Sequence, residues 1–185
     1  STVISSHLVG NQPDNLSGSV SVSNTFLQVD KKVYHLNHLD LVTKRFTGKE
    51  RSLELTSDIL DADINGQFEF AALPAAFREI VPRYLPNVLL PVKGAAVVQD
   101  FTFDVRLKNT SIVTENFFPD YSFDPKTRLY GSVRSADNRV EIHFDSPDFK
   151  LSGTRWKDLA ASISTESDHL ALRLNADTLY YSHSG

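Results

Sequence analysis

The chain has 185 residues, 41% of them hydrophobic, and a formal net charge of −4. This length and composition predict a single folded domain with a real core. Nucleic acid is excluded as a partner because phosphate contacts need clustered lysine and arginine, and no such cluster is present. The absence of cysteine excludes disulfides, thiol catalysis and thiolate metal sites.

The termini and the hydrophobic pattern indicate a processed chain or an excised fragment. The chain contains no Met, and its first residues are polar and lack the apolar core of a signal peptide. No run of about 18 apolar residues occurs, so the sequence predicts no membrane-spanning helix.

Most patterned segments alternate apolar and polar residues with a period of two. In chain order the clearest are residues 16–22, 101–108, 139–145 and 169–175. This alternation is typical of half-buried strands whose sheet has one wet face. The predicted fold is therefore mainly β: an elongated, solenoid-like or gutter-like antiparallel sheet.

The segment 58–73 carries the first half of a calcium-binding loop, because Asp61, Asp63 and Asn65 precede Gly66 at the required spacing. The loop also needs a bidentate carboxylate at its twelfth position, and that position is Ala72. The same segment alternates strictly, which puts its acids on one face of a strand and its large apolar residues on the other. We therefore predict a strand and no metal site.

One segment departs from the period of two. The apolar residues between Pro74 and Leu85 follow helical spacing, and Pro74 suits a first helical position. Pro82 and Pro86 prevent a long helix. We predict one short amphipathic helix near residues 74–85.

The chain also contains an internal repeat. Residues 15–22 resemble 128–135, residues 33–41 resemble 153–161, and residues 53–64 resemble 172–183, in the same order. Ordered repetition of a multi-strand unit predicts units that stack and continue one sheet. We expect two stacked units, about 1–66 and 129–185, joined by a helix-containing insertion at 67–128.

Catalytic signatures are missing from the sequence. No nucleophile-elbow, zinc-protease, nucleotide-binding or dinucleotide-binding motif occurs, so we predict a non-enzyme without a cofactor. Asp58 and Asp177 recur in the repeat, and we interpret both as bends held by side-chain bonds to backbone N–H groups. The only tryptophan, Trp156, matches Leu36 in the repeat, which favours an interior or groove-facing position over an exposed platform.

The apolar parity of the strands supplies the candidate binding surface. Its large side chains need a cover, either an opposing sheet or a ligand with long apolar chains, and periodicity leaves both alternatives open. The candidate lipid-binding residues are Leu60, Ile64, Phe68, Phe70, Phe101, Phe103, Val105, Leu107 and Trp156. We expect Phe103→Asp to weaken acyl binding more than Asp104→Asn.

The repeat also resembles a known family. The order of a strand, xxLxxLxL, SDxLxaxIxG and a further strand is similar to the AsmA-like superfamily of envelope proteins, above all to its TamB branch in Bacteroidetes-type bacteria. The matching places are held by Leu36, Leu39, Leu41, Ser57, Asp58, Leu60 and Gly66. The second copy keeps Trp156, Leu159, Asp177 and Leu179 but has no glycine equivalent to Gly66.

The resemblance implies a periplasmic location, with the parent protein anchored in the inner membrane. It implies a non-catalytic role in moving phospholipid between membranes, in assisting outer-membrane protein assembly with a partner barrel, or in both. Phospholipid acyl chains would be the ligand. The alternative function is that of a secreted or surface β-sandwich that binds carbohydrate or protein.

Overall fold

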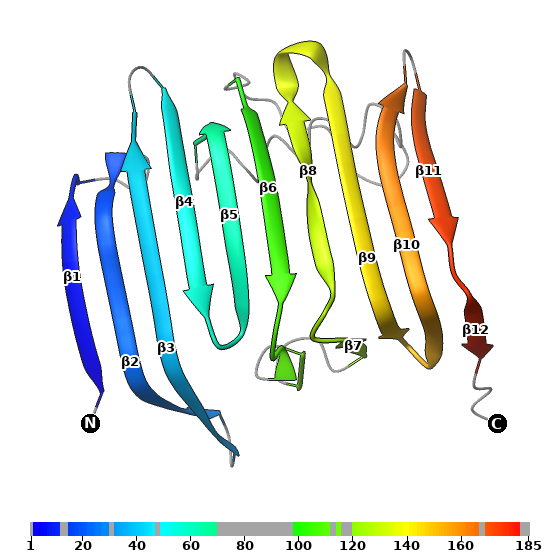
Figure 1. Ribbon diagram of the computed structural model, residues 1–185, viewed down its shortest axis with the longest axis horizontal. Coiled ribbons are helices and arrows are strands. Elements are labelled where there is room, and N and C mark those ends of the chain that lie inside the picture. Colours follow the sequence, from blue (N-terminus) through cyan, green and yellow to red (C-terminus); the bar gives the residue numbers. More distant parts are fainter. Residues whose placement is uncertain are drawn as a thin grey trace.

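The computed structural model describes residues 2–11, 15–29, 32–46, 49–69, 98–111, 114–115, 120–166 and 169–181. Its strands form one curved, open antiparallel sheet, which confirms the predicted mainly β architecture (Figure 1). The predicted helix near residues 74–85 and Phe70 lie outside the described residues. The strands are β1 (Val3–Val9), β2 (Ser17–Val29), β3 (Lys32–Arg45), β4 (Glu50–Ser57), β5 (Leu60–Gln67), β6 (Asp100–Leu107), β7 (Tyr121–Phe123), β8 (Arg128–Arg134), β9 (Arg139–Leu151), β10 (Thr154–Glu166), β11 (His169–Asn175) and β12 (Thr178–Tyr181); a 3-10 turn, η3 (Ser135–Asp137), joins β8 to β9.

The strand order follows the chain closely. The sheet runs β1-β2-β3-β4-β5-β6-β8-β9-β10-β11, while β7 pairs with β9 and β12 pairs with β10. The stretch 67–128 therefore contributes β6 to the middle of the sheet, between β5 and β8. The described chain begins and ends at opposite edges of the sheet (Figure 1).

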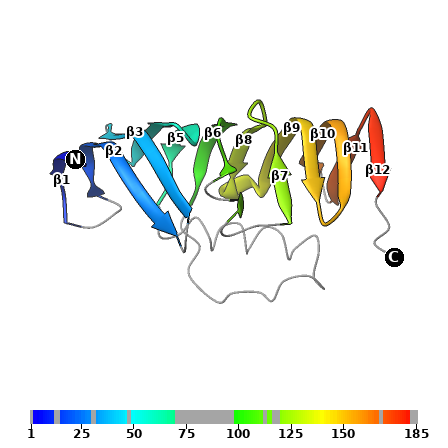
Figure 2. The ribbon, with the colours of Figure 1, turned by 90° about the horizontal axis from the view of Figure 1, so that it is seen from below.

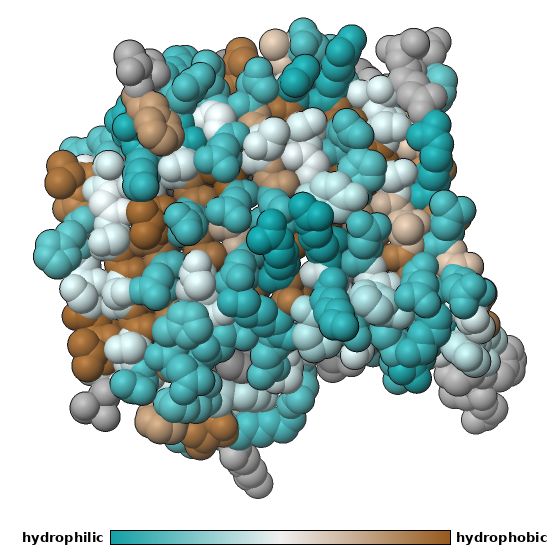
Figure 3. Space-filling view, viewed as in Figure 1, coloured by the Kyte–Doolittle hydropathy of each residue, from teal (hydrophilic) through white to brown (hydrophobic). Residues whose placement is uncertain are grey.

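The sheet has one apolar face and one polar face, as the alternation predicted. Ile64, Phe103 and Ile142 occupy one row across β5, β6 and β9, with Gly131 of β8 between the last two. The buried residues of this apolar face form one core cluster, which consists of Phe68, Phe101, Val133 and Val140 with Leu53, Ile64, Phe103 and Ile142 packed against it. The opposite, polar face is covered mainly by hydrophilic residues over the middle of the sheet (Figure 3).

The β2–β3 and β9–β10 hairpins each bend at a point where one pair of opposing residues is missing from the strand register. In β2–β3 the unpaired residues are Asn24 and Asn37, and Asn24 has a left-handed φ of 52°. In β9–β10 they are Pro147 and Asp158, and Asp158 has a φ of 49°. A left-handed residue rotates the following side chains, and a proline cannot donate to the ladder. The bent ends of β2 and β3 turn out of the plane of the sheet (Figure 2).

The bend in β9–β10 moves aromatic side chains onto the apolar face. Phe144 and Phe149 are separated by an odd number of positions, so a regular strand would place them on opposite faces. Their rings nevertheless meet edge to face with centroids 5.5 Å apart, and Phe149 stacks on Trp156 at 5.3 Å. The apolar surface therefore continues past the bend.

The turn from β4 to β5 is built by Ser57 and Asp58. The Ser57 hydroxyl accepts hydrogen bonds from the backbone N–H groups of Ile59 and Leu60, at 3.2 and 3.1 Å, and donates to the Leu60 carbonyl at 2.8 Å. The Asp58 carboxylate accepts from the backbone N–H groups of Asn37 and His38. The prediction that Asp58 forms a bend through side-chain bonds is confirmed.

Asp177 occupies a related place between β11 and β12. Its backbone N–H donates to the Lys157 carbonyl at 3.0 Å, much as the Asp58 N–H donates to the His38 carbonyl at 3.4 Å. The residue before Asp177 is Ala176, which has no hydroxyl to hold a tight turn. The chain accordingly runs on along β10 through β11 and β12 instead of folding back.

Candidate functional site

The candidate site is an apolar groove of about 420 Å³ on the apolar face of the sheet. Its floor consists of strand residues, and its rim comes from the β4–β5 turn and from the segment between β6 and β8. The described residues that line it are Ile59, Leu60, Val105, Leu107, Thr110, Thr114, Tyr121, Phe123, Thr127, Leu129 and Phe144. The volume falls within the range of small-molecule pockets.

Strand register brings the floor together from four separate strands. Leu60 of β5 pairs with Leu107 of β6, while Val105 of β6 pairs with Leu129 of β8, which in turn pairs with Phe144 of β9. Directly paired side chains in a sheet touch one another. The floor is therefore a continuous patch of branched and aromatic carbon.

One wall of the groove is aromatic. Phe123 meets Phe144 edge to face with centroids 6.4 Å apart, and it lies 5.3 Å from Phe149. β7, which carries Phe123, pairs with the end of β9 beyond the Pro147 bend. The bend thus places this wall beside the floor.

Two threonines of the groove, Thr114 and Thr127, use their hydroxyls within the protein. Thr127 is buried, and its hydroxyl bonds to the Ser146 hydroxyl at 2.7 Å. The Thr114 hydroxyl donates to the Thr110 carbonyl at 3.0 Å. Because these groups are already hydrogen-bonded, the groove offers a ligand mainly methyl, methylene and aromatic surface.

The predicted lipid-binding residues other than Phe70 and Trp156 divide into two groups. Leu60, Val105 and Leu107 line the groove. Phe68 and Phe101, each under 5% exposed, and their neighbours Ile64 and Phe103 belong to the core cluster. Phe103 is half-buried and packs against this cluster, so its substitution by Asp would test folding before binding.

Trp156 lies outside the groove residues. It is half-buried and its ring stacks on that of Phe149, so it is neither a fully interior residue nor an exposed platform.

Sequence reasoning missed the part of the groove formed by Ile59, Tyr121, Phe123, Leu129 and Phe144. Phe144 lies in the alternating segment 139–145 and Leu129 lies in the repeat segment 128–135, so both residues had a signal in the sequence. Phe123 lies in a strand of three residues, which is too short for periodicity to reveal.

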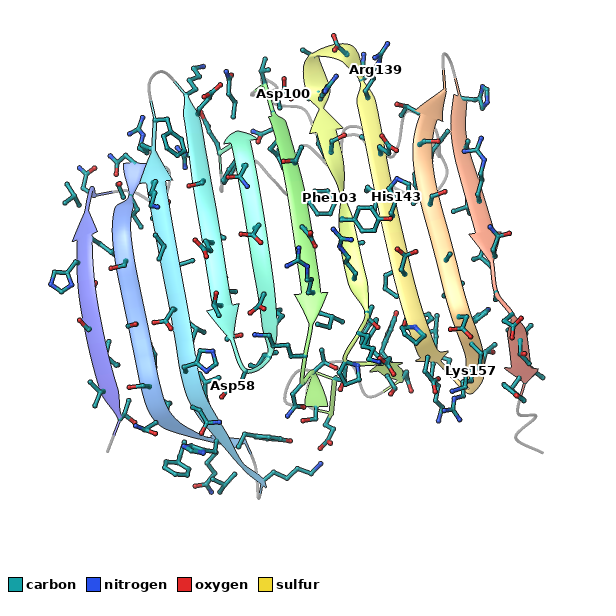
Figure 4. The ribbon with its side chains drawn as sticks, in the orientation of Figure 1. Asp58, Asp100, Phe103, Arg139, His143 and Lys157 are labelled. Atoms are coloured by element: carbon teal, nitrogen blue, oxygen red, sulfur yellow. The ribbon has the colours of Figure 1, made fainter. Side chains whose placement is uncertain are left out.

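The polar face carries a ladder of paired charges and rings. Arg128 donates two hydrogen bonds to the Asp104 carboxylate, at 2.9 and 2.6 Å, and lies over the Tyr130 ring at 4.3 Å. Tyr130 stacks on His143 at 4.9 Å, and His143 lies 3.0 Å from Glu141. The Arg128 hydrogen bonds keep the pKa of Asp104 below its usual value against the opposing effect of burial. These groups fix strand register on a wet surface; His143 of β9 is labelled in Figure 4.

The residues of the calcium-loop pattern, Asp61, Asp63 and Asn65, lie on this polar face of β5. Asp61 forms an ion pair with Lys108, with Oδ1 and Nζ 2.6 Å apart. Among the described residues, no group of three or more His, Asp or Glu side chains is placed to hold a metal ion. The prediction of a strand is confirmed for Leu60–Gln67, while residues 70–73 of the predicted segment lie outside the described residues.

The chain matches no family model, no curated protein and no solved structure. Within the described residues, no helix has the length and apolar character required to cross a membrane.

Proposed function

We propose that this chain is a non-catalytic segment of a periplasmic envelope protein that shelters lipid acyl chains in the apolar groove. Its parent protein, anchored in the inner membrane, would pass phospholipid between the membranes or support outer-membrane protein assembly with a partner barrel. The sequence resemblance to TamB-type proteins supports this setting.

The observation that carries the proposal is the chemistry of the groove lining. A groove of about 420 Å³ floored by Leu60, Val105, Leu107 and Leu129 has no charged side chain among its described lining residues. Each methylene group that leaves water for such a surface contributes about 0.8 kcal/mol. An acyl chain is the natural occupant of this groove.

The alternative of a β-sandwich that binds carbohydrate or protein has less support. All strands of the described residues belong to one sheet, so the described part of the chain gives a two-sheet sandwich no support. Trp156, which could have served as a sugar-stacking platform, packs against Phe149.

The test is a titration of the chain with a long-chain fluorescent fatty acid, using two leucine variants on the same face. Leu129 lines the groove and is 37% exposed, whereas Leu172 is 66% exposed and lies outside the groove residues. Both side chains are accessible, so both variants should fold. We expect Leu129→Gln to weaken binding about tenfold, as one leucine contact predicts, and Leu172→Gln to change it less than twofold.

Lipid mass spectrometry on the natively extracted chain gives an independent readout, with copurified lipid expected. Equal effects of the two leucine variants would refute the groove as the binding site. Absence of any fatty acid binding would refute the proposed function.

A further inference from the structure

β1 forms one free edge of the sheet (Figure 1). It pairs with β2 on one side, and no strand of the described residues lies on its other side. All seven of its residues, Val3–Val9, are exposed, and the exposed fraction reaches 69% at Ile4 and 77% at Val9. The backbone N–H and C=O groups that point away from β2 are therefore accessible to another strand.

β1 lacks the features by which natural proteins protect a free edge. Such edges usually carry a charged residue, a proline or a bulge, or they are covered by a loop or helix. The sequence of β1, VISSHLV, contains no proline and no Asp, Glu, Lys or Arg. Its seven residues also pair with β2 in an unbroken register. A regular, uncharged and exposed edge of this kind is suited to pairing with a further strand.

The opposite edge of the sheet is built differently. Its outer strand β11 carries Arg173 and ends at Asn175, and the chain then continues along β10 as the four-residue β12. A charge on the edge and a division into two short strands both discourage further pairing. The unprotected edge is therefore that of β1.

The internal repeat also shows what lies beside a strand in the position of β1. The repeat matches β2 to β8, because residues 15–22 resemble 128–135. β6 lies beside β8 as β1 lies beside β2. β6 is paired on its far side as well, with β5. In the second unit the corresponding strand is thus an inner strand of the sheet, with a neighbour on each side.

The residues of β1 are arranged symmetrically about Ser6. If two copies of β1 pair antiparallel with Ser6 at the centre, each residue faces one of similar polarity in the other copy. The facing pairs are Val3 with Val9, Ile4 with Leu8, Ser5 with His7, and Ser6 with itself. Matched apolar pairs across two strands stabilise a sheet, and no like charges meet in this arrangement.

We propose that two copies of this chain associate through β1, as an antiparallel pair with a two-fold axis at Ser6. A two-fold interface uses the same surface of both copies, which a self-matching strand provides. Facing residues of an antiparallel pair lie on the same side of the sheet. The two sheets therefore join into one, with both apolar faces on the same side. This inference goes beyond the proposed function and does not depend on the groove.

The association should be weak and reversible. Seven paired residues on each side form an interface smaller than about 1,200 Å², which is typical of transient complexes. We expect a Kd of about 10–100 μM for an interface of this size. Sedimentation velocity of the unmodified chain over this concentration range should show an equilibrium between monomer and dimer.

Two lysine variants identify the edge that pairs. Ser6→Lys should raise the Kd of the dimer at least about tenfold, because two ammonium groups would meet at the axis. Leu172→Lys is the matched control, since it adds the same charge to β11 at the opposite edge. It should change the Kd less than about twofold, because a charge so far from β1 is screened by salt. Ser6 and Leu172 are both exposed, so both variants should fold.

Single cysteines test the register, because the chain has no cysteine of its own. Ser6→Cys should give a disulfide-linked dimer under mild oxidation, since facing Cβ atoms lie about 4.5–5.5 Å apart, close to the separation in a disulfide. Val9→Cys alone should give at least about tenfold less, because the two residues 9 would lie about 20 Å apart along the strands. A mixture of Val3→Cys and Val9→Cys chains should crosslink, because these positions face each other.

The outcomes separate this interface from its alternatives. A dimer that is sensitive to Ser6→Lys and crosslinks at position 6 supports the proposal. A chain that stays monomeric at concentrations well above the expected Kd overturns it. A dimer that Leu172→Lys disrupts would use the β11 edge, and efficient crosslinking by Val9→Cys alone would mean a different register. Either result also overturns the two-fold pairing at Ser6.

Discussion

Replacement of Ser57 by Ala tests how the β4–β5 turn positions one side of the groove. Ser57 is 2% exposed, and its hydroxyl holds Ile59 and Leu60 through three hydrogen bonds. Ile59 and Leu60 both line the groove. Loss of the hydroxyl should therefore lower stability and also loosen a wall of the binding site.

The expected magnitude follows from the hydrogen bonds that are lost. Two backbone N–H groups would lose their acceptor, and each buried unsatisfied donor costs about 1–3 kcal/mol. Ile59 and Leu60 are only half-buried, so water can replace part of this loss. We expect a loss of about 2–3 kcal/mol in the free energy of unfolding, which corresponds to a fall of about 5–10 °C in Tm for a chain of this size.

Urea unfolding followed by circular dichroism measures the change as a shift of the midpoint at constant slope. Ser52→Ala is the matched control, because Ser52 lies on the polar face of the same strand and its side chain has no hydrogen bond to the described residues. Ser52→Ala should change stability by less than about 0.5 kcal/mol. If Ser57→Ala is as mild as this control, the Ser57 hydroxyl does not hold the turn.

Three further substitutions address the rest of the sheet. Gly66→Ala should lower the free energy of unfolding by at least about 3 kcal/mol. Gly66 has a φ of +133°, and an added Cβ would lie 2.2 Å from the Asp100 carbonyl oxygen. A urea midpoint near that of the unmodified chain would contradict this. Hydrogen bonds from Arg155 hold the pKa of Asp148 well below its usual value, against the effect of burial. A carboxylate with a lowered pKa in the folded state stabilises the fold at pH values above its pKa in the unfolded chain. The loss of unfolding free energy caused by Asp148→Asn should therefore be full at pH 7 and shrink as the pH falls below about 4. A loss that does not change with pH in urea titrations would exclude this linkage. Residue 158 has a left-handed φ, which glycine adopts freely and valine does not. Asp158→Gly should therefore be neutral or stabilise the fold by up to about 1 kcal/mol, and Asp158→Val should destabilise it. Thermal unfolding of both variants decides whether the bend needs that conformation.

The sequence alone predicted the strands and their two faces because period-two alternation is a local property. The alternating segments 16–22, 101–108, 139–145 and 169–175 coincide largely with β2, β6, β9 and β11. The groove was only partly predictable, since it depends on which strands become neighbours. Parity could place Leu107 on the apolar face, but it could not bring Phe123 beside Phe144, which requires the pairing of β7 with the end of β9.

The bends explain a spacing in the sequence that otherwise conflicts with strand geometry. Trp156 and Leu159 lie three residues apart, as do Leu36 and Leu39, and this spacing puts side chains on opposite faces of a regular strand. Asp158, with its left-handed backbone, lies between Trp156 and Leu159 and lets both join the apolar side, where Leu159 is 5% exposed.

In the other hairpin the left-handed residue, Asn24, is on the strand opposite Leu36, and Leu36 is again buried at 6% exposed. The xxLxxLxL spacing is therefore the signature of a strand that bends while keeping one apolar face. In β9–β10 that bend places Phe149 against Phe123, the aromatic wall of the groove, with ring centroids 5.3 Å apart. The ability to shelter an acyl chain would thus depend on the backbone conformation of residue 158, which is not one of the residues that line the groove.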